Sequence, residues 1–446
     1  MQYQRPAANA VLFALTVLAT ASAPNKAASE NNEAAVIELV KRLGGQVDTD
    51  ADRPGQPVVG VDLKKAKLTD TELKQLKQLR NLQTLDISYT SVTDADLEHL
   101  KDHKNLRSLN LHGTKVTDEG LRQLKDIKNL QELRLSGGIT DDGAKHLKEL
   151  KSLQSLSLVL TEITDAGLKD LNEIKTLQEL NLDYAGVTDA GLKELKDLKD
   201  LHTLGLWETK VTDSGLSELK ALKGLRALNL GRTKVTDAGM EELKDLENLQ
   251  ELALYETVVT DEGLNELKRL KKLEALSLGA TGVTDAGLKE LKQLTSLKTL
   301  NFGHTQVADA GLRELKELRN LETLYLYDTQ VTDAGLKELK GLKKLRTLDL
   351  WKTQVTDDGL KDLREVTSLQ TLDLRDTKVT DDGMKELKSL SRLRTLNLLG
   401  TNLTDAALKD LQELNSLQEL NVIATKVTEA GVKEFQKARP ELKIHH

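Results

Sequence analysis

The chain has 446 residues; 30% of them are charged, only 2% are aromatic, and the formal net charge is −7. So few aromatic residues cannot fill an ordinary globular core, and a mixed, mildly acidic charge balance argues against a nucleic-acid partner, which would need a basic stripe. Because the chain has no cysteine, disulfides, zinc–thiolate sites and a thiol nucleophile are excluded as well.

The first residues have the order of a secretory signal peptide. Arg5 gives a positive start, residues 10–19 form an apolar run, and small residues follow as far as Ala23. A small-x-small pattern favours cleavage after Ala21. We therefore expect residues 1–21 to be a signal peptide and the protein to be secreted or periplasmic. No later segment is long and apolar enough to span a bilayer, so we expect no stable membrane insertion after signal removal.

The next residues differ in composition from the rest of the chain. Residues 22–32 are small and polar and are predicted to be a linker. Apolar spacing then predicts an amphipathic helix over 33–43, followed by a short strand over 46–48 and a turn-rich loop. The repeats that follow would expose an apolar layer at their end. Residues 33–57 are therefore predicted to be the N-terminal cap.

Residues 58–434 repeat one unit, whose period is the interval from Leu324 to Leu348. From Leu324 one copy reads Leu-Tyr-Leu-Tyr-Asp-Thr-Gln-Val-Thr-Asp-Ala-Gly-Leu-Lys-Glu-Leu. Val61 lies one period before the first full copy, and Ile444 lies one period after the last. A fixed period of about 20–29 residues with this leucine pattern is typical of a leucine-rich repeat. The opening leucine recurs at Leu85, Leu109, Leu133, Leu156, Leu180, Leu204, Leu228, Leu252, Leu276, Leu300, Leu324, Leu348, Leu372, Leu396 and Leu420.

Each unit predicts a strand, a turn and a helix. The two leucines of Leu-x-Leu point inward, and the residues between and after them point outward. The threonine five residues after the first leucine is expected to bond turn backbone that would otherwise stay unpaired. Val-Thr-Asp-x-Gly-Leu begins a helix, where threonine or aspartate caps free amides and the aspartate suits the positive end of the helix dipole.

Stacking these units predicts an α/β solenoid. Sixteen parallel strands, from Val61 to Leu420, would form one sheet. Helices are wider than strands, so the stack must curve into a horseshoe. The parallel β-sheet is expected on its concave face and the α-helices on its convex face.

Two departures from the period are informative. The interval from Leu133 to Leu156 is one residue shorter than the others, because a position is missing near the threonine slot, and we expect a tightened turn there. Phe435 and Pro440 break the pattern, so residues 435–446 are predicted to be the C-terminal cap.

The unit resembles the leucine-rich repeats of the ribonuclease-inhibitor-like superfamily and is most similar to those of secreted bacterial proteins with repeats of the same length. Its Thr-Asp-x-Gly-Leu turn also resembles the cysteine-containing repeats of F-box adaptors, with threonine in place of the cysteine. The resemblance covers residues 58–446. It implies a protein-binding scaffold that works through its concave face, and it carries over no catalytic residues.

The aromatic side chains fall where a partner could reach them. Apart from Tyr3, every Tyr and Trp occupies an outward slot of a strand or strand end. The slot three residues after the first leucine alternates large rings with glycines, which predicts ridges and hollows on the concave face. Tyr, Trp and Arg are enriched at binding hot spots. The residues predicted to contact a partner are Trp207, Tyr255, Tyr325, Tyr327, Trp351, Arg375, Asp349 and Asp373.

Other chemistry has weaker support. His99 and His103 are four residues apart on a predicted helix, but no third ligand accompanies them, so we expect no metal. The aspartate at each helix start is interpreted as dipole stabilisation rather than as a calcium ladder. No paired catalytic carboxylates, phosphate loop or nucleophile–base pair stands out, so we expect neither an enzyme nor a cofactor.

These observations favour a secreted or periplasmic, monomeric scaffold that binds a protein or peptide on its concave face. A substrate-recognition adaptor of the F-box type is a weaker interpretation. The main alternative is a carbohydrate or cell-envelope binder, in which rings and amides line a sugar site: Trp207, Tyr327, Trp351, Asn181, Asn229 and Asn301.

Overall fold

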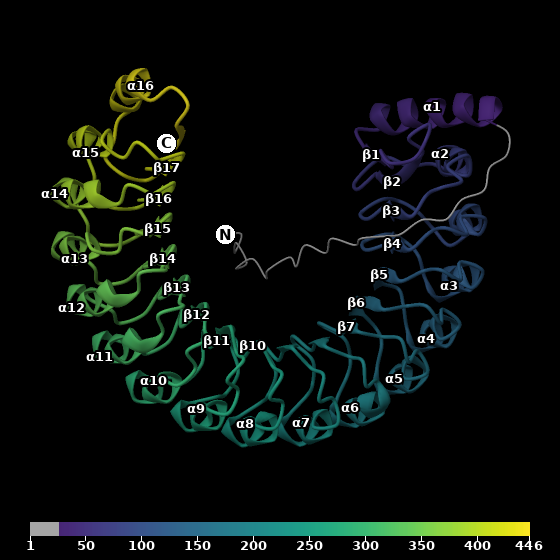
Figure 1. Cartoon of the computed structure of the whole chain (residues 1–446), viewed down its shortest axis with the longest axis horizontal. Coiled ribbons are helices and arrows are strands. Elements are labelled where there is room, and N and C mark those ends of the chain that lie inside the picture. The colour runs from purple at the N-terminus through teal and green to yellow at the C-terminus, as the bar shows by residue number, and fades with distance from the viewer. Residues whose placement is uncertain (1–25) are drawn as a thin grey trace.

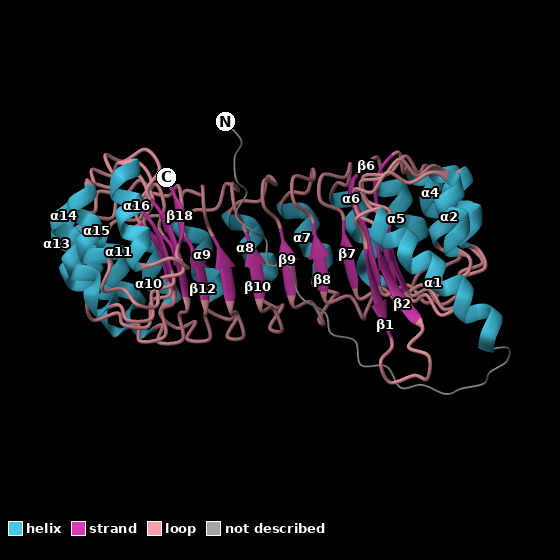
Figure 2. Cartoon of the chain, turned by 90° about the horizontal axis from the view of Figure 1, so that it is seen from above, coloured by secondary structure: helices cyan, strands magenta, loops and turns pink. Residues whose placement is uncertain are grey.

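The computed structural model describes residues 26–446, with side chains from residue 33 onward. The chain forms a horseshoe in which strands line the concave side and helices cover the convex side (Figure 1). From above, the strands stand side by side along the inner wall with the helices behind them (Figure 2). The predicted α/β solenoid is confirmed. The predicted signal peptide, residues 1–21, lies outside the described residues.

Within residues 26–446, eighteen strands form one sheet. From β2 to β18 each strand pairs in parallel with the next, and opening leucines lie opposite one another, as Leu324 does to Leu348. Among the described strands only β1 pairs antiparallel, with β2. The sixteen predicted strands are β2–β17, and β18 adds one at Ile444. The strands are β1 (Gln46–Thr49), β2 (Val58–Asp62), β3 (Thr84–Asp86), β4 (Ser108–Asn110), β5 (Glu132–Gly137), β6 (Ser155–Thr161), β7 (Glu179–Asn181), β8 (Thr203–Gly205), β9 (Ala227–Asn229), β10 (Glu251–Ala253), β11 (Ala275–Ser277), β12 (Thr299–Asn301), β13 (Thr323–Tyr325), β14 (Thr347–Asp349), β15 (Thr371–Asp373), β16 (Thr395–Asn397), β17 (Glu419–Asn421) and β18 (Lys443–His445).

A short helix or 3-10 turn follows the strand of each repeat on the convex side. In the part of the chain that the structure describes, no helix is long and apolar enough to cross a membrane. The α-helices are α1 (Lys26–Arg42), α2 (Asp70–Leu76), α3 (Asp118–Leu124), α4 (Asp141–Leu147), α5 (Asp165–Leu171), α6 (Asp189–Glu194), α7 (Asp213–Leu219), α8 (Asp237–Leu243), α9 (Asp261–Leu267), α10 (Asp285–Leu291), α11 (Asp309–Leu312), α12 (Asp333–Leu336), α13 (Asp357–Leu363), α14 (Asp381–Met384), α15 (Asp405–Leu411) and α16 (Glu429–Ala438). The 3-10 helices are η1 (Ala95–Leu100), η2 (Leu195–Asp197), η3 (Arg313–Glu317), η4 (Lys337–Gly341) and η5 (Lys385–Ser389).

The core is a stack of leucine layers. Leu252 and Leu254, on either side of an outward residue of the β10 repeat, are 2% and 0% exposed. Leu264 and Leu267 of α9 are equally buried and belong to the same hydrophobic cluster. Burying a leucine side chain stabilises the fold by about 1.5–3 kcal/mol. This repeated layer, rather than an aromatic core, holds the array together.

The threonine slot fixes the turn at the end of each strand. In the β10 repeat, Thr257 is buried and its Oγ1 donates to the carbonyl of Leu254 at 2.7 Å. Glu256, just before it, adopts a left-handed backbone with φ of 55°. The role predicted for threonine is confirmed. The same bond is made by Thr90, Thr161, Thr209, Thr233, Thr281, Thr305, Thr329, Thr353, Thr377 and Thr401.

The aspartate at each helix start joins one repeat to the next. Both carboxylate oxygens of Asp261 accept bonds from Thr284 of the following repeat, from its amide at 2.8 Å and its hydroxyl at 2.6 Å. Thr284 also caps its own helix, because its Oγ1 accepts the Ala286 amide at 3.3 Å. These charge-assisted bonds across the repeat boundary go beyond the dipole role predicted from the sequence. The same pair of bonds joins Asp94–Thr117, Asp118–Thr140, Asp141–Thr164, Asp165–Thr188, Asp189–Thr212, Asp213–Thr236, Asp237–Thr260, Asp309–Thr332, Asp333–Thr356, Asp357–Thr380, Asp381–Thr404 and Asp405–Thr428.

This aspartate explains the glycine of the helix start. A Cβ on Gly287 would overlap Oδ1 of Asp261, and other repeats show the same crowding. Gly287 does not have a left-handed backbone, so close packing rather than conformational freedom favours glycine here. Ala407 occupies the slot in one repeat, and the preceding clamp survives, since the Thr404 amide still reaches Asp381 at 2.8 Å.

The shortened repeat, between Leu133 and Leu156, has the tightened turn that its length predicts. The Ile139 amide donates to the carbonyl of Gly137 at 2.5 Å, which closes a three-residue turn. A second effect is not predicted by the sequence. β5 and β6 are longer than their neighbours, and their pairing runs through a register shift as far as Gly137 and Thr161.

Both ends of the array are covered. α1 begins at Lys26 rather than Glu33, so this helix takes in most of the segment predicted to be a linker. The lysine and alanines at its start favour a helix. Val36 and Val40 of α1 are buried in the hydrophobic cluster of the repeats. At the other end, the buried Phe435 belongs to α16, so this helix crosses the predicted boundary between array and cap.

Candidate binding surface on the concave face

Two slots of each strand face the hollow of the horseshoe: the residue between the two leucines and the residue after the second. Neighbouring strands are ~4.8 Å apart, so equal slots form rows along the sheet. The eight predicted site residues lie in these rows in two groups. Trp207 and Tyr255, just beyond β8 and β10, form the central pair. The remaining six, on or just beyond β13–β15, form the C-terminal patch: Tyr325, Tyr327, Asp349, Trp351, Asp373 and Arg375.

The central pair is a stack across a glycine. The rings of Trp207 and Tyr255 lie 5.6 Å apart at an angle of 18°, although one repeat separates them. They meet because the intervening repeat has Gly231 in this slot, where a Cβ would overlap the indole. The space left by the glycine is therefore filled by a ring.

Tyr327 lies against the sheet rather than standing out from it. It is 8% exposed, and a Cβ on Gly303 would overlap its ring. Its ring stacks on Trp351 at 6.0 Å and meets His304 edge-on at 5.1 Å. Burial raises the pKa of Tyr327 to about 12. The predicted ridges and hollows are therefore wrong here and at the central pair, because the rings occupy the spaces that the glycines leave.

Trp351, like Tyr325, is a partly exposed ring of the C-terminal patch. Its Nε1 donates to Asp376 at 2.8 Å, and the Arg375 guanidinium lies 5.0 Å from its ring centre. Asp373 in turn holds the Nε of Arg375, at 2.9 Å from Oδ1 and 2.8 Å from Oδ2. A hydrogen bond, a cation–π contact and an ion pair thus fix the ring in advance, which lowers the entropy lost on binding.

Asp349 lies between Tyr325 and Asp373, which face it from the neighbouring strands. Its Oδ1 accepts the Trp351 amide at 2.9 Å. Among the described residues none donates a hydrogen bond to its Oδ2 or forms a salt bridge with it. Burial, and then repulsion by Asp373, raises the pKa of Asp349 to about 6. The carboxylate is poorly solvated and lacks a cation of its own.

The sequence analysis missed an ionic row at the rim, in the slot four residues after the first leucine. His304 Nδ1 lies 2.6 Å from Asp328 Oδ2, and Lys352 Nζ lies 2.9 Å from Asp328 Oδ1. Opposite charges one period apart in this slot are the signal that would have predicted it. A second such row, with contacts of 2.7 and 2.9 Å, joins Glu208, Arg232 and Glu256.

The three asparagines named for the carbohydrate alternative form hydrogen bonds with backbone amides. The side-chain oxygens of Asn181, Asn229 and Asn301 accept the amide two residues ahead, at 2.8, 3.1 and 2.9 Å. Asn301 is also 8% exposed. These side chains shape the strand ends, which weakens the case for a sugar site.

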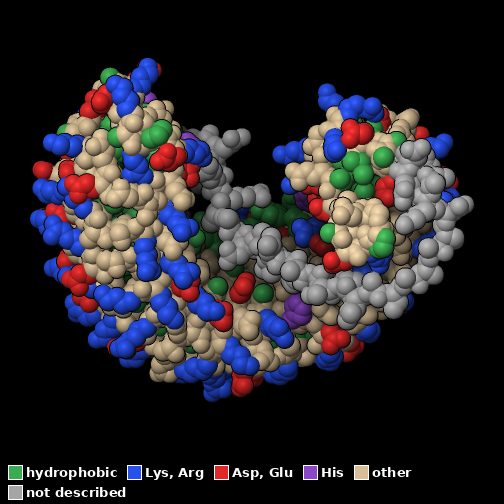
Figure 3. All heavy atoms as spheres, turned by 45° about the horizontal axis from the view of Figure 1, so that its top comes forward, with side chains coloured by type: hydrophobic (Ala, Val, Ile, Leu, Met, Phe, Trp, Pro, Cys, Tyr) green, Lys and Arg blue, Asp and Glu red, His purple; other side chains and the backbone are tan. Residues whose placement is uncertain are grey.

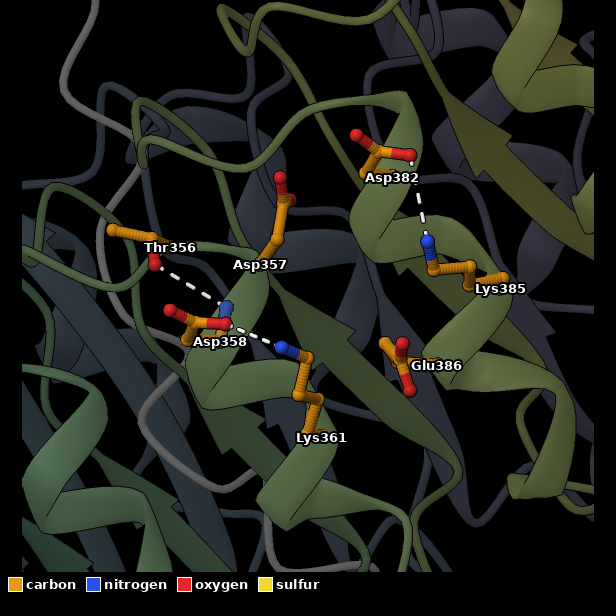
Figure 4. A pocket seen from close by; sticks show the side chains of 7 residues that line it. All are labelled: Thr356, Asp357, Asp358, Lys361, Asp382, Lys385 and Glu386. Carbon is orange, nitrogen blue, oxygen red and sulfur yellow. Dashed lines mark hydrogen bonds and ion pairs between the residues drawn. The ribbon is translucent and has the colours of Figure 1, made fainter.

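On the convex side, opposite to the predicted binding face, a groove lies between α13 and α14. Its lining residues are labelled in Figure 4. Lys and Arg are interspersed with Asp and Glu over the outer surface (Figure 3). The groove therefore has no unbalanced group to attract a ligand, because its charged side chains have local partners: Asp358 with Lys361 at 2.5 Å, Asp382 with Lys385 at 3.4 Å, Asp357 with Thr380, and Glu386 with Arg364.

The histidine pair suggested by the sequence is not a pair on one helix. η1 ends at Leu100, so His103 lies beyond it, contrary to the prediction. His99 Nε2 is 2.6 Å from Asp70, and His103 is buried. In residues 26–446 no group of three or more His, Cys, Asp or Glu side chains could hold a metal ion.

Two repeat-family models match the sequence. One, described as two copies of leucine-rich repeats, matches residues 319–364. The other, described as a leucine-rich repeat, matches residues 102–124, 149–171, 174–196, 225–244, 293–316 and 367–388. No curated protein matches the chain.

Solved structures are similar over most of the chain. A leucine-rich repeat protein of Leptospira interrogans is 25% identical over 85% of this chain and 99% of that one, with a TM-score of 0.56. TLR13, in complex with ssRNA13, is 20% identical over 86% of this chain and 60% of that one, with a TM-score of 0.51. The internalin inlF of Listeria monocytogenes is 19% identical over 93% of this chain and 94% of that one, with a TM-score of 0.49. Repeat, fold and matches together identify the chain as a leucine-rich repeat protein.

Proposed function

We propose that the chain is a non-enzymatic scaffold that binds a protein or extended peptide on its concave face, chiefly through the C-terminal patch. The observation that carries this proposal is the patch itself. Trp351 is a partly exposed ring already fixed by Asp376 and Arg375. Asp349 beside it keeps an unused acceptor. Trp, Tyr and Arg carry much of the binding energy at protein interfaces.

The spacing of the two aromatic groups suits an extended ligand. Trp207 and Trp351 lie six strands apart, which at ~4.8 Å per strand is roughly 29 Å along the sheet. An extended peptide covers about 3.3 Å per residue, so roughly nine residues would reach from one group to the other. One segment of a partner could therefore contact both groups.

Two other partner classes have less support. TLR13 was solved with an RNA, but the present chain has a net charge of −7, and its C-terminal patch contains two carboxylates against one guanidinium. A sugar would need free amides beside the rings, and the asparagine side-chain oxygens there are used by the backbone. The proposal also includes export, which follows from the signal-like residues 1–21.

The test is a selection from a phage-displayed random dodecapeptide library on the immobilised chain. We expect enriched peptides that bind the parent and bind Trp351→Ala/Arg375→Ala about tenfold or more weakly. The convex-side pair Lys337→Ala/Glu338→Ala is the control and should leave binding intact. A glycan array and a labelled single-stranded RNA test the other classes, and we expect neither to bind. No enriched peptide, or loss of binding with the convex pair alone, would overturn the proposal.

A further inference from the structure

The C-terminal patch carries a negative charge that the described residues do not balance. Asp349 and Asp373 lie opposite each other on β14 and β15. The patch contains one guanidinium, that of Arg375, and its Nε contacts are with Asp373. Two carboxylates and one guanidinium leave one net negative charge on a partly buried surface.

Asp349 differs from an aspartate in the same slot elsewhere on the concave face. Asp86 of β3 has both carboxylate oxygens occupied, by the Ser88 amide at 2.8 Å and by the Asn110 side chain at 2.9 Å. Asp349 accepts the amide of Trp351 on Oδ1 and no hydrogen bond from the described residues on Oδ2. Its open oxygen therefore calls for a donor from outside the chain, and Asp86 provides a matched control.

The shape of the patch suits a guanidinium. Both carboxylate oxygens of Asp373 are already occupied by Arg375 and Asn397, so the open Oδ2 of Asp349 is the acceptor that an incoming donor would meet. Tyr325 faces Asp349 from the adjacent strand β13, and no ring or cation contact of the described residues involves its ring, whereas the Trp351 ring already meets Tyr327 and Arg375. A guanidinium stacks on aromatic faces more readily than an ammonium does. Lysine, with its compact charge, would use less of this arrangement.

We infer that the C-terminal patch recognises an arginine side chain of the partner, held by the open carboxylate oxygen of Asp349 beside Tyr325. This inference rests on the proposed function and names the chemistry of its partner. It adds a specific contact to a surface that otherwise offers aromatic area.

A pH dependence follows from the same groups. Because its pKa is raised to about 6, Asp349 is ionised at pH 7 and protonated at pH 5, and only the ionised form attracts a cation. Affinity should therefore fall as the pH falls through 6. His304 lies 6.3 Å from the Trp351 ring and stays in the Asp349→Asn variant, so the difference between the two pH profiles belongs to Asp349. The other groups facing Asp349 are Tyr325 and Tyr327 from the β13 side and Asp373 and Arg375 from the β15 side.

The experiment repeats the dodecapeptide selection at pH 7 on the parent, on Asp349→Asn and on the matched Asp86→Asn chain. Arginine should be enriched over the unselected library on the parent and on Asp86→Asn, and not on Asp349→Asn. The best peptide is then made with arginine or with citrulline, which keeps the shape without the charge. On the parent the citrulline form should bind about tenfold more weakly, a difference that disappears on Asp349→Asn and at pH 5.

The possible failures are distinguishable. Peptides that bind the parent without arginine enrichment, or equally well as citrulline forms, would overturn this inference and leave the proposed function standing. Failure to select any peptide would overturn both. A melting curve shows whether Asp349→Asn folds, and we expect it to be at least as stable as the parent because a poorly solvated charge is removed.

Discussion

At the scale of single residues, stability comes from side chains that serve the next repeat as well as their own. Asp261 accepts two bonds from Thr284, and Thr284 then caps the helix that it precedes. The two bonds from Thr284 to Asp261 cross a repeat boundary. They therefore contribute to the interface between neighbours, the quantity that governs cooperativity in a linear array.

The chain offers a matched pair to measure this clamp. Asp285, one repeat on, has Ala308 in place of the threonine and so accepts only a backbone amide, at 2.7 Å. We expect Asp261→Ala to lower the free energy of unfolding by about 1.5–3 kcal/mol, because bonds to a charged group are lost. Asp285→Ala should cost about half as much. Urea unfolding followed by circular dichroism measures both losses, and equal losses would contradict the clamp.

Asp349 should reduce stability at neutral pH. Folding raises the pKa of Asp349 from 3.8 to about 6, so between these values the folded chain holds a proton that the unfolded chain has released. Stability then falls as the pH rises through this window, and the full cost is present above pH 6. Asparagine keeps an acceptor for the Trp351 amide without the charge.

We therefore expect Asp349→Asn to be more stable than the parent by about 1–2 kcal/mol at pH 7. Residual exposure of the side chain keeps this figure below the full value of the shift. Below the unfolded pKa of 3.8 the two chains should be equally stable. Thermal unfolding of the two chains at pH 7 and at a pH below 3.8 measures both stability differences. A variant less stable than the parent at pH 7 would show that the carboxylate is well compensated.

At the scale of the element, each strand is a short copy of a pattern that could be predicted, and its leucines are buried as expected. The partners of the polar slots could not be predicted so easily. A threonine and the aspartate that it bonds belong to different repeats, and a period does not tell which neighbour a side chain turns to. Thr284 and Asp261 could each have served only their own helix.

The depth of the rings was also missed, although the sequence holds the signal. Tyr327 occupies the slot one period after Gly303, and Trp207 occupies the slot one period before Gly231. A large ring next to a glycine one period away has room to lie flat. A prediction that takes each slot as a separate exposed position, or each glycine as an empty hollow, does not account for a ring that lies over the glycine of the neighbouring repeat.

Tyr327 and Trp351 stack on each other but differ in how deeply they are buried, and this difference should appear in the stability of their variants. Tyr327 is 8% exposed and Trp351 is only partly buried. Tyr327→Ala should lower the free energy of unfolding by about 2–4 kcal/mol, because it removes a buried ring and leaves a cavity over Gly303. Trp351→Ala should cost about half of that or less. Chemical denaturation of both variants tests this order. The reverse order would mean that Trp351, not Tyr327, is the structural ring.

At the scale of the whole molecule, the chain is a horseshoe whose convex groove between α13 and α14 has paired charges, while Asp349 on the concave face forms no ion pair with the described residues. The period predicted this architecture because every copy has the same leucines. It could not predict the longer β5 and β6, since the lost residue changes the turn and the strands together. The location of the protein depends on residues 1–21, which only the sequence describes.

Export can be tested by mass. The predicted cleavage after Ala21 means that protein from its native host should start at Ser22. Intact mass spectrometry of the purified protein, with fractionation of the culture, reads out both the N-terminus and the compartment. A full-length mass in the cytosolic fraction would contradict secretion while leaving the binding surface unaffected.

The central claim is that a partner occupies the concave face at the C-terminal patch. The chain has two tryptophans, Trp207 and Trp351, one in each aromatic group. Trp207→Phe leaves Trp351 as the sole reporter, and Trp351→Phe leaves Trp207. Each single-tryptophan chain is titrated with a selected peptide, and the fluorescence change is compared with the Kd from the anisotropy of the labelled peptide.

The account predicts that the emission of Trp351 shifts and saturates with the Kd of the labelled peptide, because the ligand displaces water from this ring. Trp207 should respond as well if the peptide is long enough to span both groups. Saturating peptide that leaves the Trp351 emission unchanged, while anisotropy reports binding, would place the partner elsewhere and contradict the central claim.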